Sequence, residues 1–254
     1  MKLGIIGCGA IGNDIGKAAD TMKEIEKIYL WDIKAKASED LCALLKKAEI
    51  LPVEQFLKVV DVVIEAASQQ AVVQYGVMVL ESGKDLILMS VGSLFDDKLQ
   101  KKLEDTARKQ HCKIYLPSGA VCGIDGILAA GIDELNSVTL VTTKPPASLG
   151  LKVDRRTVVF RGSAREAVKK FPKNINVAAS LSLAGIGFDE TKVEIVADPV
   201  ESRISHKILA HGHFGRLRAE VENMPNPNNP QSSYMASLSA IALLRRIIDP
   251  IQIG

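Results

Sequence analysis

Short apolar segments rich in Val, Ile and Leu alternate with longer amphipathic segments through residues 1–120. Such apolar segments are typical of strands that are buried on both faces, as in a parallel sheet. The predicted strands are 1–6, 27–31, 49–50, 59–67, 85–90 and 113–116, and the predicted helices are 13–22, 35–47, 53–57, 70–82 and 95–110. This alternation predicts an α/β fold with a doubly wound parallel sheet and helices on both of its faces.

The pattern changes after residue 120, where strands with alternating polar and apolar positions become common. The predicted strands are 138–143, 157–161, 192–197, 205–210 and 215–222, and the predicted helices are 125–132, 163–171 and 174–185. Residues 225–230 contain three prolines and are expected to form an irregular connector. Residues 232–248 read as an apolar helix that has to be buried. The second region is therefore predicted to be an α+β domain with a mostly antiparallel sheet.

A glycine-rich segment, Gly7-Cys8-Gly9-Ala10-Ile11-Gly12, follows the first predicted strand. Gly7 lets the chain turn sharply, Gly9 lets a pyrophosphate approach the backbone, and Gly12 lets the helix lie close to the strand. The free N–H groups at the helix start, at Ala10 and Ile11, are expected to face the phosphates. The spacing alone also fits a simple glycine-rich turn, but the strand before it and the helix after it favour a dinucleotide site.

Asp32 ends the second predicted strand, about 20 residues after the loop, where the dinucleotide fold places an acidic residue. A carboxylate here can accept hydrogen bonds from both ribose hydroxyls of the adenosine half of NAD. It would repel the 2′-phosphate of NADP, but Lys34 is close enough in the chain to weaken that repulsion. We therefore expect NAD as the cofactor and leave NADP open.

Two other stretches, 66–69 and 118–120, also follow predicted strands of the parallel sheet. Ligands of such sheets lie beyond the carboxyl ends of the strands. The small residues Ala67, Ser68 and Ala120 suit the close approach of a flat cofactor. Each is equally explained by a tight turn between a strand and a helix.

The composition is that of an ordinary globular protein, with 47% hydrophobic and 24% charged residues. The net charge of +2 and the 4% of aromatic residues give no support to a nucleic-acid or membrane partner. The chain has four cysteines, and none is spaced as in a metal site or a redox motif, so we expect reduced thiols and a cytoplasmic protein. The N-terminal apolar segment is too short for a signal peptide, and we expect no membrane span.

The chain contains four histidines, His111, His206, His211 and His213. His111 ends a polar helix and is expected to be solvated. His211 and His213 are expected on the same face of one strand, but no Cys or carboxylate at a suitable spacing supports a metal site. His206 is expected on the opposite face of the strand from His211. It is either a satisfied polar residue of the strand or a general acid/base with a pKa near the operating pH.

Asn174 and Asn176 flank an isoleucine at the start of a predicted helix. Asn174 fits a simple helix N-cap, whereas the functional alternative for either residue is a carboxamide that anchors the nicotinamide amide or the substrate. No residue type or spacing at this point decides between the two.

The chain resembles the L-aspartate dehydrogenase family over nearly its whole length. The motifs that carry the resemblance are Gly7-Cys8-Gly9-Ala10-Ile11-Gly12, Ser118-Gly119-Ala120 with Gly123 and Asp125, Phe171-Pro172-Lys173-Asn174-Ile175-Asn176-Val177-Ala178-Ala179, His206 with Gly212-His213-Phe214-Gly215, the tail Glu222-Asn223-Met224-Pro225-Asn226-Pro227, and Ser239-Ala240-Ile241-Ala242. One departure is Ile204, which stands where the family often has an asparagine.

This resemblance implies an NAD(P)-dependent oxidoreductase that deaminates L-aspartate to iminoaspartate. The product then hydrolyses to oxaloacetate and ammonia or enters quinolinate and NAD biosynthesis. The resemblance also implies a homodimer. It places Ala120 and Asn176 at the cofactor and His206 as the catalytic histidine. Because aspartate has two carboxylates, basic or polar side chains are needed, and Ser118, Lys144 and Lys207 are the substrate candidates, with Arg203 a further cation.

Two other readings keep the same first domain. One is a related two-domain reductase, such as a dihydrodipicolinate reductase or a homoserine dehydrogenase relative, and the other is a non-catalytic NAD-sensing protein. For the aspartate dehydrogenase interpretation, 1–120 is expected to be the dinucleotide-binding Rossmann domain and 121–230 the α+β domain for substrate binding, catalysis and dimerisation. The C-terminal helix within 231–254 is expected to pack back on the first domain.

Overall fold

The computed structural model describes residues 1–171 and 175–253, except for the side chains of residues 230 and 231. The chain divides into two compact units. Unit 1 comprises residues 1–117 and 237–253, and unit 2 comprises residues 118–236. The predicted helix cap at Asn174 lies outside the described residues.

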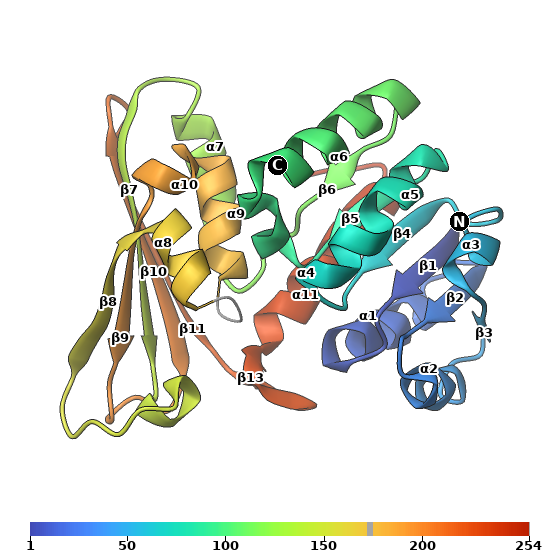
Figure 1. Cartoon of the computed structure of the whole chain (residues 1–254), viewed down its shortest axis with the longest axis horizontal. Helices are drawn as coiled ribbons and strands as arrows, with labels where there is room; N and C mark the ends of the chain where they lie inside the picture. The colour runs from blue at the N-terminus through green and yellow to red at the C-terminus, as the bar shows by residue number, and fades with distance from the viewer. Residues whose placement is uncertain (172–174, 254) are drawn as a thin grey trace. The chain divides into compact units, whose positions relative to one another are not determined.

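Unit 1 is built on a six-stranded sheet in the order β3-β2-β1-β4-β5-β6 (Figure 1). All of its strand pairs are parallel, which confirms the prediction from the apolar segments. The strands are β1 (Lys2–Ile6), β2 (Lys27–Trp31), β3 (Ala48–Ile50), β4 (Val62–Glu65), β5 (Asp85–Leu88) and β6 (Ile114–Tyr115). The carboxyl ends of β1, β2 and β4 carry the predicted cofactor loops, so the sheet brings these loops to one edge.

Helices lie between the strands of unit 1 in the chain, and the C-terminal helix follows the strands of unit 2. They are α1 (Ala10–Thr21), α2 (Ala35–Cys42), α3 (Val53–Phe56), α4 (Gln69–Ala71), the π-helical turn η1 (Val72–Gly76), α5 (Val77–Glu81), the 3₁₀ turn η2 (Val91–Phe95), α6 (Asp97–Gln110) and α11 (Tyr234–Ile248). The apolar face of α11 joins the core of the sheet, where Leu243 and Leu244 pack in one cluster with Leu3, Ile5 and Ile15. The C-terminal helix is therefore part of the core of unit 1.

Two helices of unit 1 differ from the sequence-based expectation. The predicted helix 35–47 ends at Cys42, because the chain then turns so that the backbone N–H of Lys47 can donate to Asp20 Oδ1, 2.8 Å away. The predicted helix 70–82 is continuous but contains the π-helical turn at Val72–Gly76. Local propensity does not reveal either feature, since both depend on neighbouring elements.

Unit 2 contains a five-stranded sheet in the order β11-β10-β7-β9-β8. The strands are β7 (Leu135–Lys144), β8 (Thr157–Ser163), β9 (Lys192–Ala197), β10 (Ile204–Gly212) and β11 (Gly215–Asn223). The pair β7 and β9 is parallel and the other pairs are antiparallel, as predicted for a mostly antiparallel sheet. Figure 1 shows helices α7 (Ile124–Ala130), α8 (Ala164–Lys170), α9 (Asn176–Ala184) and α10 (Gly187–Glu190) together on one face of this sheet, with the 3₁₀ turn η3 (Pro146–Leu149) in the loop after β7.

Two expectations for unit 2 are wrong. The proline-containing connector is not irregular, because β12 (Pro225–Asn226) and β13 (Asn229–Ser233) form a short hairpin in which Asn226 Oδ1 accepts from the N–H of Asn228. His213 does not share a strand with His211, since β10 ends at Gly212 and His213 lies in the following turn. The His213 ring instead contacts Asp133, with 2.9 Å between Nδ1 and Oδ2.

Candidate functional site

The glycine loop of unit 1 is held by close backbone packing. Gly7 has a φ of +99°, and its N–H donates to the carbonyl of Trp31 at 2.8 Å. A Cβ on Gly7 would lie 2.7 Å from the carbonyl of Ala66, and a Cβ on Gly12 would overlap the carbonyl oxygen of Gly7. Both positions therefore require glycine for steric reasons.

Gly9 has a different role from Gly7 and Gly12. An added Cβ on Gly9 would meet no atom of the described residues within 4 Å, so the loop is open to solvent at this point. Gly9 precedes α1 and has no side chain that could accept from the N–H groups of Ala10 and Ile11. Uncapped amides with the positive end of the helix dipole behind them fit the pyrophosphate of a dinucleotide.

The carboxylate of Asp32 is fixed by the backbone around it. Its Oδ2 accepts from the N–H of Cys8 at 2.7 Å, and its Oδ1 accepts from the N–H of Lys34 at 2.8 Å. These bonds hold the Asp32 carboxylate beside the glycine loop. Burial, reinforced by the charge of Asp32, raises the pKa of the Cys8 thiol to about 12, so this cysteine is an uncharged part of the loop.

One pocket of unit 1 brings four of the predicted cofactor residues together. Its lining includes Gly7, Asp32, Ala67 and Ser68. Sequence reasoning missed two aromatic residues of the same pocket, Trp31 and Tyr75, whose rings pack edge to face with 5.0 Å between their centroids. Trp31 could have been predicted, because it directly precedes Asp32 at the end of an apolar strand. Tyr75 could not, because its position depends on the π-helical turn.

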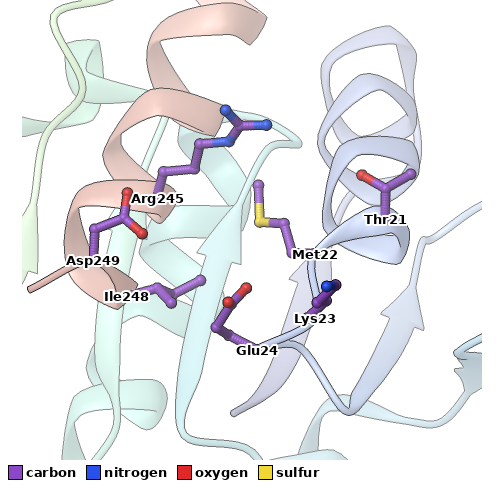
Figure 2. A pocket seen from close by; sticks show the side chains of 7 residues that line it. All are labelled: Thr21, Met22, Lys23, Glu24, Arg245, Ile248 and Asp249. Carbon is purple, nitrogen blue, oxygen red and sulfur yellow. The ribbon is translucent and has the colours of Figure 1, made fainter.

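Figure 2 shows a second pocket of unit 1, lined by Thr21, Met22, Lys23, Glu24, Arg245, Ile248 and Asp249. It lies between the carboxyl end of α1 and the end of α11. It is therefore at the other end of α1 from the glycine loop. None of the residues predicted to bind the cofactor lines this pocket.

His206 lies on the helix-covered face of the sheet in unit 2. It is 6% exposed, and its Nδ1 is 2.9 Å from Oγ1 of Thr142, directly across on β7. Burial, with a further contribution from the positive charge of Lys144, lowers the pKa of His206 to about 3. This pKa is lower than the value near the operating pH that was expected of a general acid/base, because the buried imidazole is held neutral.

Lys144 shares this face of β7 with Thr142, since residues two apart on a strand point the same way. It is 5% exposed, and burial lowers the pKa of its ammonium to about 8. Thr142 and Lys144 also line one small cavity, together with Ile175, which precedes α9, and Ala178 of α9. A neutral imidazole and a buried cation therefore occur on one face of one sheet.

Lys207 points to the opposite face of β10 from His206, as the neighbouring residue of a strand must. It faces Glu220 on β11, with 3.8 Å between Nζ and Oε2. Arg203 is likewise paired, with Glu222 at 3.3 Å. The structure therefore brings Lys144, but not Lys207, to the face that carries His206.

The remaining predicted residues lie at the turns of unit 2. Ser118 is half-buried before Gly119, which has a φ of +71°, and Ala120 is buried. The carbonyl of Ala120 accepts from Nδ2 of Asn223 at 3.0 Å. Asn176 is exposed at the first position of α9.

Three polar residues at these sites were missed by sequence reasoning: Thr142, Asn223 and Glu65. A carboxylate inside the apolar run 59–67 was a usable signal for Glu65. Thr142 carries no such signal, because its partner His206 is distant in the chain. Asn223 stands in the motif 222–227, but the motif does not reveal that its partner is the carbonyl of Ala120.

Family models match both parts of the chain. Residues 7–117 match the NAD-binding domain of homoserine dehydrogenase, and residues 125–247 match the C-terminal domain of aspartate dehydrogenase. The helices of the described residues include none that is long and apolar enough to cross a membrane.

Similar proteins cover the chain from end to end. L-Aspartate dehydrogenase of Methanosarcina barkeri is 46% identical over 100% of this chain and 99% of its own length, and that of Nitrosopumilus maritimus is 42% identical with the same coverage. The crystal structure of aspartate dehydrogenase from Thermotoga maritima has a TM-score of 0.86 at 31% identity, covering 100% of this chain and 99% of its own. A homoserine dehydrogenase from Thiobacillus denitrificans shares only the fold, at 10% identity, a TM-score of 0.63 and coverage of 97% of this chain and 73% of its own.

Three findings agree: the identity of more than 40% to full-length relatives, the family model that matches residues 125–247, and the shared fold. The chain belongs to the L-aspartate dehydrogenase family.

Proposed function

We propose that this protein oxidises L-aspartate at its α-carbon with NAD, giving iminoaspartate that hydrolyses to oxaloacetate and ammonia or feeds quinolinate and NAD biosynthesis. The observation that carries the proposal is the buried, neutral His206 on the same sheet face as the buried cation Lys144. Membership of the L-aspartate dehydrogenase family supports the choice of substrate.

The residues of unit 1 fit a dinucleotide. The N–H groups of Ala10, Ile11 and Gly12 suit the pyrophosphate, which the open space at Gly9 admits. Asp32, oriented by two backbone N–H groups, suits the ribose of NAD and disfavours NADP. Cofactor contacts are also proposed for Gly7, Ala67, Ser68, Ala120 and Asn176. When bound, the nicotinamide accepts the hydride that leaves the α-carbon of the substrate.

His206 is proposed to remove a proton from the substrate amine or to activate the water that attacks the imine. The amine has to be neutral before its lone pair can assist departure of the hydride. Thr142 fixes the orientation of the imidazole through Nδ1, which leaves Nε2 as the nitrogen that can act on substrate. Because burial lowers its pKa to about 3, the imidazole is neutral at neutral pH, and it becomes an effective base only when that pKa rises.

Lys144 is proposed to bind a substrate carboxylate. Its charge is one cause of the low pKa of His206, so pairing that charge with a carboxylate would raise the pKa of the imidazole. Substrate binding would then make the base stronger at the moment it is needed. Ser118 and Lys207 are weaker substrate candidates, and Lys207 is on the other face of the sheet.

We also propose that the protein is a cytoplasmic homodimer. The sheet face opposite His206 carries partly exposed apolar residues, including Val158 at 46% and Leu209 at 37% exposure. Covering such residues with the same face of a second copy would remove them from water. Sedimentation equilibrium tests this part of the proposal, and a monomer at all accessible concentrations would contradict it.

The activity is tested by NADH absorbance after L-aspartate is added to the protein with NAD at alkaline pH. Oxaloacetate with ammonium and NADH tests the reverse reaction. The same assay with NADP, homoserine and other amino acids separates this proposal from a related reductase. Binding of NADH without turnover of any substrate would instead indicate a non-catalytic NAD-sensing protein.

A further inference from the structure

Glu65 is a carboxylate in the interior of unit 1. It ends β4, an otherwise apolar strand, and is 2% exposed. Its Oε1 accepts from the N–H groups of Ala67 and Ser68 at 2.8 and 2.9 Å, and from the hydroxyl of Ser90 at 2.9 Å. Its Oε2 accepts from the N–H of Ser90 at 2.9 Å. Burial raises the pKa of Glu65, while these four hydrogen bonds oppose that effect.

Only a carboxylate satisfies this arrangement. All four bonds place a donor against the side chain, and an ionised carboxylate is a pure acceptor with about four lone-pair sites. A glutamine at this position would direct its own N–H₂ group at one or more of those donors. Hydrogen bonds to a charged acceptor are also stronger than those between neutral groups, which offsets the cost of burying the charge.

The backbone held by Glu65 adjoins the glycine loop. Ala66 donates its N–H to the carbonyl of Ile6, and its own carbonyl lies 2.7 Å from the position that a Cβ of Gly7 would take. Ser68 continues the turn and caps α4 by accepting from the N–H of Ala71. The turn 66–68 is thus held by the bond from Ala66 to β1 and by the carboxylate of Glu65, which also binds Ser90 after β5.

The same turn forms one wall of the pocket that contains Asp32. Ala67 and Ser68 line that pocket together with Gly7 and Trp31. A movement of the turn would change the shape of this pocket directly. Glu65 lies behind the wall, since it is buried and does not line the pocket itself.

We propose that Glu65 is a positioning residue for the dinucleotide, whose carboxylate holds the turn 66–68 in the conformation that binds the cofactor. The inference rests on the proposed function of unit 1 in binding a dinucleotide. It assigns no contact between Glu65 and the cofactor. Its effect is therefore on affinity for NADH and not on the chemical step.

The test is a titration of the full chain with NADH, followed by the fluorescence of Trp31. Trp31 is the single tryptophan of the chain and lines the pocket, so its emission reports on occupancy. Glu65→Gln is expected to raise the Kd for NADH by about tenfold, the effect of disturbing at least one charged hydrogen bond. The KM for NAD should rise in parallel, while the KM for L-aspartate stays within about twofold of wild type.

The matched control is Glu81→Gln, which removes an exposed carboxylate at the end of α5 and should leave the Kd unchanged. Ser90→Ala removes one of the four hydrogen bonds without disturbing the charge, and it should raise the Kd by about threefold. If Glu65→Gln does not fold, as judged by circular dichroism, Ser90→Ala decides the question.

A Kd for folded Glu65→Gln within about twofold of wild type would overturn the inference, even if its unfolding temperature fell. An unchanged Kd for Ser90→Ala, where Glu65→Gln is unfolded, would overturn it as well. Failure of the wild-type chain to bind NADH at all is a different outcome. That result would contradict the proposed function itself, and therefore also the inference about Glu65.

Discussion

The two units build their candidate sites in different ways. In unit 1 the site is made mainly of backbone, namely the glycine loop and the turn at 66–68, and its requirements are steric. In unit 2 it is made of side chains from neighbouring strands, with Thr142 and Lys144 on β7 and His206 on β10. Substitutions in unit 1 should therefore act on binding and folding, and those in unit 2 on turnover and its pH dependence.

Each unit also contains a buried charged side chain, Glu65 in unit 1 and Lys144 in unit 2, and the two have different effects. Glu65 in unit 1 is surrounded by four hydrogen-bond donors, so its charge serves to fix the backbone. Lys144 in unit 2 instead lowers the pKa of a neighbouring ionisable group, His206. One buried charge fixes the backbone, and the other adds to the effect of burial on the pKa of a neighbouring side chain.

The largest effect is expected for Gly12→Ala. A Cβ at this position would overlap the carbonyl oxygen of Gly7, so α1 would have to move away from β1. We expect a loss of more than ~3 kcal/mol in the free energy of unfolding and no measurable NADH binding. Thermal unfolding and Trp31 fluorescence measure the two effects.

Gly9→Ala separates the effect on cofactor binding from the effect on folding. Its Cβ would enter open space, so the unfolding temperature should stay near that of wild type. The methyl group would nevertheless obstruct a pyrophosphate, and the Kd for NADH should rise by about tenfold or more. Equal destabilisation by both variants would show that the loop is shaped by something other than the contact at Gly12.

His206→Ala should lower kcat by about 10²–10⁴-fold, the range typical of a general acid or base. NADH binding should be unchanged, because His206 is not among the residues proposed to contact the cofactor. Steady-state kinetics and the Trp31 titration provide the two measurements. Turnover near the wild-type rate would show that His206 is a structural residue of the sheet.

Sequence alone predicted the features that depend on consecutive residues. The glycine loop, the position of Asp32 and the apolar strands of unit 1 follow from local spacing and burial on both faces. The partnership of His206 with Thr142 could not be predicted, since the residues are 64 positions apart and meet only through the strand register.

Long-range packing explains the other differences as well. The hairpin β12–β13 was expected to be irregular because of its prolines, yet Asn226 supplies the turn with a side-chain acceptor. Both Lys144 and Lys207 were substrate candidates from the sequence, and only the register assigns them to opposite faces. The sequence shows which residues of one strand share a face, because side chains alternate along it. It does not show which of the two faces is buried.

Acidification should destabilise the protein through His206. Its pKa is about 3 when folded and near 6.5 when unfolded, so between these values only the unfolded chain takes up the proton. This contribution to stability is present above pH 6.5 and is lost as the pH falls toward 3. We expect it to amount to ~2–4 kcal/mol, measured by urea unfolding at pH 7 and pH 4.

The same experiment on His206→Gln isolates the contribution. The variant should lose less stability than wild type between pH 7 and pH 4, because it has no buried imidazole to protonate. His211→Gln, which changes an exposed histidine on the other face of β10, should behave as wild type. Identical acid sensitivity of all three proteins would contradict a buried neutral His206.

Lys144→Met should raise the KM for L-aspartate by about tenfold at pH 7, where the ammonium is charged. Because the pKa of Lys144 is about 8, the wild-type KM should itself rise as the pH increases through 8 and the charge is lost. Initial rates at pH 6.5 to 9.5 measure both effects. A KM that is unaffected by the substitution and by pH would remove Lys144 from substrate binding.

The smallest effect is expected for Lys207→Met, the matched control for Lys144. Lys207 loses only a weak, partly exposed ion pair with Glu220, worth less than ~0.5 kcal/mol, and Arg218 remains 3.5 Å from the same carboxylate. The KM and kcat for L-aspartate should therefore stay within about twofold of wild type. If Lys207→Met raised the KM tenfold while Lys144→Met did not, the substrate would bind on the open face of the sheet, and His206 would be on the wrong side to act on it.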